Sequence, residues 1–350
     1  MKNFVRKLLK WYRHSGRHDL PWQQGADAYR VWVSEIMLQQ TQVTTVIPYY
    51  LRFIRRFPDV HVLAGADIDD VLHLWSGLGY YARARNMHKA ARIISGEYND
   101  VFPVDIDALI ALPGIGRSTA GAILALGRGQ VHPILDGNVK RVLTRFHGIY
   151  GWPGDKNVEE KLWAVAAQQT PKKHVADYTQ AIMDLGATIC TRSRPACDRC
   201  PVAEECYAYR QGVQADLPTR KLKKSLPVRH AIFTIIENRR GEILLEKRPP
   251  AGIWGGLWSL PECPVHEDVP AWIKRQFGST VNRLVELSPM RHTFSHFHLD
   301  IRPYQAKLKS VDVSIRDQGD ICWYKPGLKH RLGLAAPVKK LLQEVAGVGT

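Results

Sequence analysis

The feature that most constrains the fold is a group of four closely spaced cysteines. They are separated by six, two and five residues and are Cys190, Cys197, Cys200 and Cys206. Four thiols in so short a loop are typical of a [4Fe–4S] cluster or of a zinc site with four cysteine ligands. Zinc ribbons usually use two separated Cys-x2-Cys pairs, and only one such pair is present here. The loop at 190–206 therefore favours an iron–sulfur cluster with a structural role.

The composition of the chain indicates what it binds. With 350 residues and 45% apolar side chains, it has room for two or three domains. The net charge of +16 predicts a polyanionic partner, nucleic acid before a membrane, with a merely basic soluble protein as the alternative. No apolar run approaches the ~18 residues of a membrane span, and charges interrupt the short apolar stretches near the N-terminus. We expect a cytoplasmic monomer, associated with the nucleoid if bacterial, that does not bind membranes.

Residues 1–217 are expected to form an all-α domain. Apolar residues recur there at helical spacing, and turn residues such as Pro48, Pro58 and Pro103 separate the helical segments. The expected helices cover about 2–14, 28–42, 46–57, 68–75, 82–95, 106–111, 118–127, 137–146, 157–169 and 174–186.

Beyond residue 217 the pattern changes. Residues 218–229 carry five basic side chains and no acidic one, which is typical of a solvated linker that could also follow a phosphate backbone. Strand patterns then cover 230–237, 242–248 and 291–308, and Phe297, Leu299 and Ile301 share one face of the last. With short helices at about 268–277 and 335–346, residues 230–350 are expected to form an α+β domain.

A turn rich in proline and glycine joins two of the expected helices. Pro113, Gly114 and Gly116 let the backbone approach a partner closely, and the helix that starts at Ser118 has free N–H groups that suit a phosphate. Asp136 follows on a short turn and precedes a basic helix. A phosphate seat followed by a carboxylate is typical of a nucleic-acid enzyme. The alternative is an ordinary helical corner with Asp136 as its N-cap.

A second acidic residue, Glu35, lies in an apolar helical segment and is expected to be partly buried. Burial raises the pKa of a carboxyl group and fits it to donate a proton near neutral pH, although an exposed helix residue is the plainer interpretation. Hydrolysis of a glycosidic bond uses two carboxyl groups with separated pKa values. Glu35 and Asp136 would form such a pair, one protonating the leaving group and the other staying ionised beside the oxocarbenium-like sugar.

Two further motifs are suited to a DNA duplex. The polar side chains that follow Glu35 are Gln39, Gln40, Thr41 and Gln42. They could fill the gap that an extruded base leaves, or they could simply form a polar helix face. Tyr80 and Tyr81 lie on a glycine turn and precede two arginines, which suits a wedge into stacked bases with phosphate contacts behind it. The alternative is a tyrosine pair in the core.

These motifs together identify a family. The N-terminal part resembles the helix–hairpin–helix, iron–sulfur DNA glycosylase superfamily, which includes endonuclease III, and within it the adenine DNA glycosylases. The resemblance rests on the cysteine spacing and on the segments 34–41, 77–85, 112–120 and 135–140. It implies a helix–hairpin–helix at 106–126 and a [4Fe–4S] cluster. It also implies base excision repair of duplex DNA, in which adenine opposite 8-oxoguanine or guanine is flipped out and removed.

The same resemblance implies roles for individual residues. Glu35 matches the general acid that protonates the purine and later helps to activate water, and Asp136 matches the carboxylate that stabilises the sugar cation. Asn138 matches a residue that helps to position these groups. Tyr80 and Gln40 match residues that enter the base stack beside the oxidised guanine. The other expected DNA contacts in this part are Thr41, Gly114, Gly116, Ser118 and Lys140.

One position bears on the type of reaction. Relatives that also cut the strand carry a lysine in the second helix of the hairpin, and its amine forms a Schiff base with the sugar. Ser118 stands at that position, and a hydroxyl cannot do so. The enzyme is therefore expected to be monofunctional and to leave an abasic site, with Lys140 as the remaining nearby amine. The alternatives are a bifunctional endonuclease III-like glycosylase/lyase and a non-catalytic iron–sulfur DNA-binding protein.

The C-terminal part resembles the Nudix hydrolase fold. The glutamates that should cluster beyond residue 262 as a metal-binding box are missing, so hydrolysis of nucleoside diphosphates is not expected. The resemblance implies that a loop formed by Phe294, Ser295 and His296 recognises 8-oxoguanine. His292, His296 and His298 alternate along a strand and lack a clear fourth ligand, which favours a surface role over a metal site.

Overall fold

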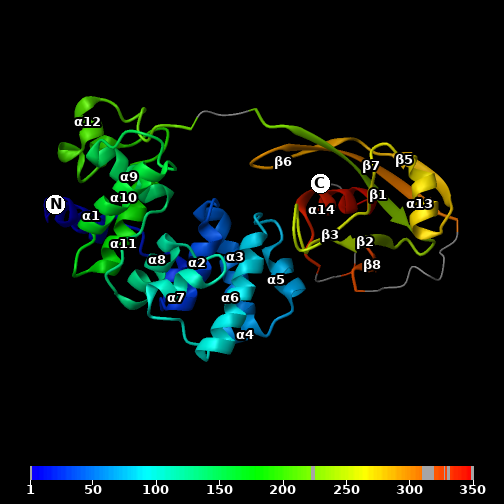
Figure 1. Cartoon of the computed structure of the whole chain (residues 1–350), viewed down its shortest axis with the longest axis horizontal. Helices are drawn as coiled ribbons and strands as arrows, with labels where there is room; N and C mark the ends of the chain where they lie inside the picture. The colour runs from blue at the N-terminus through cyan, green and yellow to red at the C-terminus, as the bar shows by residue number, and fades with distance from the viewer. Residues whose placement is uncertain (1, 222–224, 310–318, 327, 329–331, 348–350) are drawn as a thin grey trace. The chain divides into compact units, whose positions relative to one another are not determined.

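The computed structural model describes residues 2–221, 225–309, 319–326, 328 and 332–347, and Figure 1 shows its helices and strands. The chain divides into two compact units. The first consists of Met1–Gly65 and Asn86–Lys223, and the second of Ala66–Arg85 and Lys224–Thr350. Residues 222–224 of the expected basic linker lie outside the described residues. The boundaries expected at 217 and 230 remain a prediction.

The first unit is built from helices. Its α-helices are α1 (Lys2–Ser15), α2 (Ala28–Leu38), α3 (Val43–Arg56), α4 (Val60–Ala64), α6 (Ala82–Tyr98, which begins in the second unit), α7 (Ile106–Ala111), α8 (Arg117–Arg128), α9 (Gly137–His147), α10 (Lys156–Gln169), α11 (Val175–Asp184) and α12 (Tyr207–Gln211). Short 3-10 turns lie at Pro21–Gln23, Cys197–Arg199 and Ala203–Glu205. No strand occurs between residues 2 and 221, all of which are described, so the expected all-α architecture is confirmed. None of the described helices is long and apolar enough to cross a membrane.

Aspartates fix where many of these helices begin. An N-cap aspartate accepts a hydrogen bond from a backbone N–H of the first turn, which would otherwise have no partner. The N-cap aspartates of the first unit that do so are Asp27, Asp59, Asp105, Asp136 and Asp155. Of these five caps, Asp136 also lines the cavity described below, and the other four do not line it.

The structure differs from the expected helices in three places. The helix expected at 28–42 ends at Leu38, because Gln40 adopts a left-handed backbone conformation with φ 58°. The short helices α4 and α12 were not expected. Helix α11 ends at Asp184 and is followed by a π-helical turn, Leu185–Ile189, which periodicity alone does not reveal.

A single apolar core holds the cluster loop and the hairpin in place. Phe4, Leu8 and Tyr12 recur every four residues along one face of α1 and are buried against residues of α8, α9, α10 and α11. Val202, Cys190 and Cys200 of the cysteine loop pack on the same core. The loop therefore rests on the same side chains that position α9.

The second unit combines α5 (Ile68–Trp75) with a mixed β-sheet. Its other elements are β1 (Val228–Glu237), β2 (Ile243–Lys247), β3 (Trp258–Ser259), β4 (Glu262–Cys263), α13 (Val269–Phe277), β5 (Val281–Glu286), β6 (Met290–Thr293), β7 (His298–Leu308), β8 (Ile321–Tyr324) and α14 (Ala336–Val345). The sheet order is β3-β2-β1-β7-β5, with β4 beside β1, β6 beside β7 and β8 beside β2. Strands β1 and β7 pair in parallel, and the other pairs are antiparallel.

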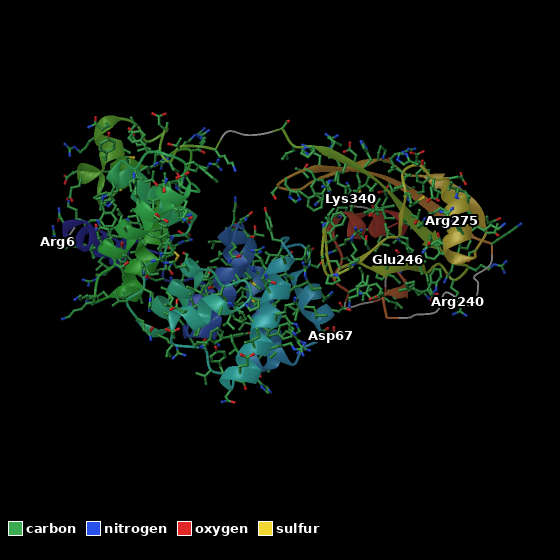
Figure 2. The ribbon with its side chains drawn as sticks, viewed as in Figure 1. Arg6, Asp67, Arg240, Glu246, Arg275 and Lys340 are labelled. Carbon is green, nitrogen blue, oxygen red and sulfur yellow. The ribbon has the colours of Figure 1, made fainter. Side chains whose placement is uncertain are left out.

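One face of this sheet is covered by α13. Trp272, Ile273 and Phe277 of that helix are buried against Ile236 of β1 and Ala306 of β7. The polar side of the same helix faces solvent, as Figure 2 shows for Arg275. The sheet and its helices thus give the α+β domain that the sequence predicted.

The strand expected at 291–308 is divided in two. Residues 294–297 form a turn between β6 and β7, closed by a 2.9 Å hydrogen bond from Phe294 N–H to the Phe297 carbonyl. The expected alternation holds along β7, where Leu299 and Ile301 are buried. Strand β5, which was not expected, pairs with β7 and is mostly exposed, so its sequence lacks a clear apolar face.

Candidate active site

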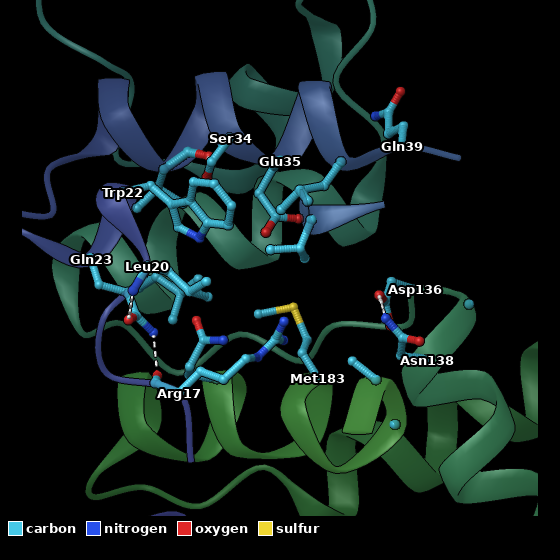
Figure 3. Close-up of a pocket in the computed structure, with 18 of the residues that line it drawn as sticks. Arg17, Leu20, Trp22, Gln23, Ser34, Glu35, Gln39, Asp136, Asn138 and Met183 are labelled. Atoms are coloured by element: carbon cyan, nitrogen blue, oxygen red, sulfur yellow. Dashed lines mark hydrogen bonds between the residues drawn. The ribbon is translucent and has the colours of Figure 1, made fainter. Parts of the chain in front are cut away.

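A cavity of about 1150 Å³ lies in the first unit. Glu35 reaches into it from α2, and Asp136 faces it from the start of α9 (Figure 3). Met183 of α11 lines the same space. The two carboxyl groups that sequence reasoning paired, a hundred residues apart in the chain, are thus brought to one cavity.

Asp136 is held by the first turn of α9. Its Oδ1 accepts a hydrogen bond from Val139 N–H at 2.7 Å, and its Oδ2 accepts one from Asn138 Nδ2 at 3.2 Å. Burial raises the pKa of Asp136, while these hydrogen bonds and the nearby Arg141 guanidinium lower it. Asp136 is therefore the N-cap of α9 and also a carboxylate that lines the cavity. The alternative of an ordinary helical corner with Asp136 as its N-cap describes only the first of these two features.

No hydrogen-bond donor is among the groups that shift the pKa of Glu35. Burial, together with the nearby charge of Asp136, raises the pKa of Glu35 to about 8. Asp136 differs from Glu35 in that hydrogen bonds from Val139 and Asn138 favour its ionised form. Two carboxyl groups with opposite protonation are what acid-assisted glycosidic hydrolysis needs.

A chain of hydrogen bonds links Asp136 to the cysteine loop. The Arg141 Nη2 donates to Asn138 Oδ1 at 2.8 Å, and Asn138 in turn donates to Asp136. Arg141 also donates from Nε to the Cys190 carbonyl at 2.7 Å and from Nη2 to the Gly186 carbonyl at 2.6 Å. The side chain of Asn138 is therefore oriented by Arg141, which is itself fixed by the backbone beside the first cysteine.

Gly186 allows the π-helical turn to approach this chain of contacts. A Cβ atom at Gly186 would lie 2.7 Å from the Asn138 Cβ and 3.0 Å from the Asn138 carbonyl oxygen. Real Cβ atoms do not come so close, so α9 or the turn would have to shift. The absence of a side chain at Gly186 is thus a condition for the observed position of Asn138.

A Gly186→Ala variant is expected to misplace Asn138 and Asp136. We expect single-turnover adenine release to slow by about tenfold or more, and the free energy of unfolding to fall by about 1–3 kcal/mol. Quench-flow kinetics and chemical denaturation measure the two effects. The matched control is Gly96→Ala on α6, where a Cβ meets nothing within 4 Å. This variant is expected to be slightly more stable, because alanine favours the helix over glycine. Equal behaviour of the two variants would contradict this role of Gly186.

The four cysteines of the loop are free thiols that lie near one another. Burial, together with the charges of the other three cysteines, raises the pKa of Cys200 to about 12. Arg145, which is buried, donates to Cys190 Sγ at 3.4 Å and to the Thr191 carbonyl at 2.7 Å. Four thiols in mutual electrostatic reach, beside a buried cation, fit an anionic metal–thiolate group. Among the described residues, no three histidine, cysteine or acidic side chains form a group that could hold a single metal ion.

The hairpin presents its backbone to solvent. Gly114, with φ 80°, and Gly116 are exposed, and Gly116 caps α8 without using a side chain. The Ser118 hydroxyl accepts a hydrogen bond from Leu135 N–H at 3.0 Å and so ties the hairpin to the turn before Asp136. The Lys140 amine pairs with Glu159 at 2.6 Å. Both side chains thus have structural contacts in addition to the DNA contacts expected from the sequence.

The polar turn after α2 lies at the cavity. Gln39, Gln40 and Thr41 all line it, and Gln40 is exposed with its left-handed backbone. A non-glycine residue with positive φ is strained, and such strain clusters at functional sites. The turn therefore places an exposed amide at the cavity that Glu35 also lines.

The two tyrosines of the second unit have different surroundings. Tyr80 is 48% exposed and has a φ of 48°, whereas Tyr81 is buried and donates to the Leu334 carbonyl at 3.3 Å. Of the two residues considered for a wedge, the structure leaves only Tyr80 accessible. The core alternative describes Tyr81.

The turn at 294–297 projects from an aromatic cluster. The Phe294 ring stacks on Phe297 with centroids 4.6 Å apart and contacts Trp254 at 5.3 Å. Ser295 and His296 are exposed at its tip. We call residues 294–296 the reader loop. Its exposed polar tip on a packed aromatic base suits recognition of a planar base.

Sequence reasoning missed a polar group on the cavity wall. Arg17 donates to the buried Asp184 from its backbone N–H at 2.7 Å and from its Nη2 at 2.6 Å, and Gln180 donates to Asp184 at 2.8 Å. Trp22 lines the same cavity, on the side where Ser34 lies (Figure 3). The signal in the sequence is weak: Gln180 and Asp184 lie four residues apart on a helix that also carries Asp177 and Thr179. These side chains give the cavity stacking surface and hydrogen-bonding groups for a heterocyclic base.

Comparison with known proteins agrees with this geometry. The model of the HhH-GPD superfamily of base excision DNA repair proteins matches residues 33–168, and that of the NUDIX domain matches residues 232–344. An adenine DNA glycosylase of Buchnera aphidicola subsp. Acyrthosiphon pisum is 41% identical over 340 residues, which is 97% of both chains. That of Homo sapiens is 32% identical and covers 98% of this chain and 74% of its own length.

Solved structures share the fold of the helical part. A thermostable thymine-DNA glycosylase is 25% identical with a TM-score of 0.54, and covers 60% of this chain and 96% of its own. Endonuclease III in a non-covalent DNA complex is 21% identical with a TM-score of 0.52. The match covers 61% of this chain and 96% of the endonuclease III chain. Because its relatives match along nearly its whole length and both domains are present, this chain belongs to the adenine DNA glycosylase family.

Proposed function

We propose that this adenine DNA glycosylase removes adenine opposite 8-oxoguanine or guanine in duplex DNA by acid-assisted hydrolysis at Glu35 and Asp136. The observation that carries the proposal is the cavity that both residues line, in which burial raises the pKa of Glu35 and hydrogen bonds from Val139 and Asn138 favour the ionised form of Asp136. Adenine leaves poorly as an anion, so a proton donor beside it lowers the barrier. A fixed carboxylate beside the sugar stabilises the oxocarbenium-like transition state.

The remaining residues would prepare the substrate. Adenine cannot be reached inside the stack, so it is flipped into the cavity at a cost of a few kcal/mol, and less for a mismatch. Gln40 and Thr41 lie at the mouth, and Tyr80 is the exposed aromatic that would enter the gap. The exposed amides at Gly114 and Gly116 would hold a phosphate at the start of α8. Asn138 would keep Asp136 in place, and Ser118 would leave the reaction without a lyase step.

The cysteine loop fits a [4Fe–4S] cluster held by Cys190, Cys197, Cys200 and Cys206. When bound, the cluster would cross-link the loop rigidly. Clusters of this type also transfer electrons in other proteins. Here its thiolates would be balanced by Arg145, and the Cys190 carbonyl would keep Arg141 oriented toward Asn138. We propose a structural role for it. The expected monomeric state and cytoplasmic location stay predictions.

The experiment is base release across mismatches. Purified enzyme is given duplexes with adenine opposite 8-oxoguanine, guanine, cytosine or thymine, and cleavage is followed with and without alkali. We expect release from the first two, fastest opposite 8-oxoguanine, with strands that break only after alkali. Ser295→Ala and His296→Ala should reduce the preference for 8-oxoguanine over guanine. Equal rates on all four duplexes, or strands cut without alkali, would contradict the proposal.

The rate of adenine release should depend on pH through Glu35. Its pKa is raised from 4.5 to about 8, so the catalytic proton is present below pH 8 and is lost as the pH rises through that value. We expect the single-turnover rate to fall about tenfold for each pH unit above 8. The single-turnover rate at saturating enzyme, measured as a function of pH, tests this decrease. A rate that changed only near pH 5 and stayed constant above it would exclude Glu35 as the acid.

A further inference from the structure

Residues 66–85 form one body with the Nudix-like sheet of the second unit. The Oδ2 of Asp69, in the first turn of α5, accepts hydrogen bonds from Lys247 Nζ at 2.9 Å and from Trp258 Nε1 at 3.4 Å. Lys247 and Trp258 are register partners on β2 and β3. Asp69 and Lys247 are only 23% and 22% exposed. An ion pair so shielded from water is more costly to break than one on an open surface.

A second contact fixes the turn that follows α5. The Leu334 carbonyl accepts hydrogen bonds from Ser76 Oγ at 3.0 Å and from Tyr81 OH at 3.3 Å. The backbone beside it is close to α5, since a Cβ at Gly333 would lie 2.8 Å from the Leu72 Cβ. These contacts are made to backbone atoms, so they depend on the path of the chain at 333–334 rather than on a flexible side chain.

A third contact leads toward the reader loop. The Arg85 Nη1 donates to the Gly255 carbonyl at 2.5 Å. The preceding residue, Trp254, is in a left-handed conformation with φ 53°, and its ring contacts those of Phe294 at 5.3 Å and His292 at 5.4 Å. Arg85 is therefore attached to the turn whose tryptophan supports the base of the reader loop.

Tyr80 lies between these contacts. Ser76 anchors the chain before it, and Tyr81 and Arg85 anchor the chain after it. Within the turn, Trp75 Nε1 donates to the Gly79 carbonyl at 3.1 Å. The backbone of Tyr80 is thus fixed to the sheet from both sides, while its ring stays exposed.

We propose that residues 66–85 are a docking element of the Nudix-like domain, which holds Tyr80 at a set distance from the reader loop, with Asp69, Lys247 and Arg85 as positioning residues. The proposal rests on the proposed function, in which Tyr80 and the reader loop meet the same damaged pair. Two groups held on one rigid body engage a duplex with less loss of freedom than two groups that move independently. Discrimination of the oxidised base therefore depends on the docking contacts, although none of them touches DNA.

One feature of Asp69 fits a positioning role. Its Oδ1 is buried and has no hydrogen-bond partner among the described residues. An unpaired buried oxygen costs stability, which an apolar residue at this position would avoid. A carboxylate that meets both a lysine and an indole N–H permits one docked geometry, whereas apolar contacts permit several.

The test uses full-length enzyme with Lys247→Met, which keeps the stem and removes the charge, and with Asp69→Asn. Lys247→Arg is the conservative variant. Lys307→Met is the matched control, because Lys307 pairs with Glu237 at 3.1 Å in the same sheet. The readouts are the ratio of single-turnover rates for adenine opposite 8-oxoguanine and opposite guanine, and the fluorescence of 2-aminopurine placed next to the 8-oxoguanine. Hydrogen exchange of peptides from 66–85 is measured on the free proteins.

We expect Lys247→Met and Asp69→Asn each to lower the rate ratio by about tenfold, to reduce the 2-aminopurine signal and to speed exchange at 66–85. The double variant should lose no more than either single variant, since both remove one interaction. Lys247→Arg and Lys307→Met should match the wild-type enzyme. An unchanged ratio in Lys247→Met and Asp69→Asn would overturn the positioning role, and unchanged exchange would overturn the docking.

The two proposals fail in different ways. If the wild-type enzyme released adenine equally fast opposite 8-oxoguanine and opposite guanine, 8-oxoguanine recognition would be contradicted. Hydrogen exchange in the free proteins would still decide whether Asp69 and Lys247 dock residues 66–85. If the wild-type enzyme and the Lys247→Met variant preferred adenine opposite 8-oxoguanine to the same degree, only the positioning role would be contradicted.

Discussion

A Glu35→Gln variant is expected to release adenine about 10²–10⁴-fold more slowly than the wild-type enzyme, the usual contribution of a general acid. Glutamine keeps the size and the polar character of the side chain but has no proton to give to the leaving base. Binding of a duplex that carries adenine opposite 8-oxoguanine should stay within about twofold, since the variant leaves the cavity wall intact. Single-turnover kinetics and equilibrium titration measure the two quantities on the same protein.

The control for this variant is Glu160→Gln, at an exposed position on α10. It makes the same Glu-to-Gln exchange away from the cavity and should leave the rate unaltered. A Glu35→Gln enzyme that retains more than about a tenth of the wild-type rate would show that the proton comes from another group. Loss of binding in parallel with the rate would show that Glu35 holds substrate rather than protonating it.

The same variant should be more stable than the wild-type enzyme at alkaline pH. The folded protein keeps a proton on Glu35 up to about pH 8, whereas the unfolded chain releases it near 4.5. The free energy of unfolding therefore falls as the pH rises between these values, and glutamine removes that fall. We expect the unfolding free energies of the two proteins to differ by about 4 kcal/mol more at pH 8 than at pH 4, measured with urea.

An Asp136→Asn variant is expected to lose about 10²–10³-fold in the rate of adenine release while keeping its melting temperature. The negative charge that stabilises the sugar cation disappears, and one preorganised electrostatic contact of this kind is worth such a factor. Asparagine is as good an N-cap as aspartate, so the hydrogen bond from Val139 N–H can be retained. Kinetics and thermal unfolding thus separate the catalytic role of Asp136 from its capping role.

Asp155→Asn is the matched control, because Asp155 is the N-cap of α10 and accepts from Asn157 and Val158 N–H groups. It should alter neither rate nor stability. Asp136→Ala should lose the same activity and, in addition, about 1 kcal/mol of stability from the missing cap. If Asp136→Asn retained full activity, Asp136 would be a cap alone, as the plainer interpretation of the sequence holds.

The fold was largely predictable because its signals are local. Apolar residues at helical spacing and N-cap aspartates mark most helices of the first unit, and the buried Leu299 and Ile301 mark the alternating face of β7. Glu35 and Asp136 were predicted from their residue types and from family resemblance. Their placement on one cavity agrees with that prediction, while the roles assigned to them remain for experiment.

Other features could not be predicted, because they depend on contacts between distant segments. The family resemblance singled out Tyr80, but residue types and spacing alone do not distinguish the exposed Tyr80 from the buried Tyr81, since the Leu334 carbonyl that accepts from Tyr81 lies far along the chain. The pairing of Arg17 with Asp184 is equally non-local. The π-helical turn at Leu185–Ile189 has no periodic signal in the sequence, and its Gly186 packs against the distant Asn138.

We propose that Glu35 is protonated at neutral pH because its carboxyl group is buried and faces the charge of Asp136. The most direct measurement is the pKa of Glu35, from NMR titration of side-chain ¹³C-labelled glutamate with the signal assigned by Glu35→Gln. The mechanism predicts a pKa of about 8 in the wild-type enzyme and a lower pKa in Asp136→Asn. A Glu35 pKa near 4.5 that does not respond to Asp136→Asn would contradict it.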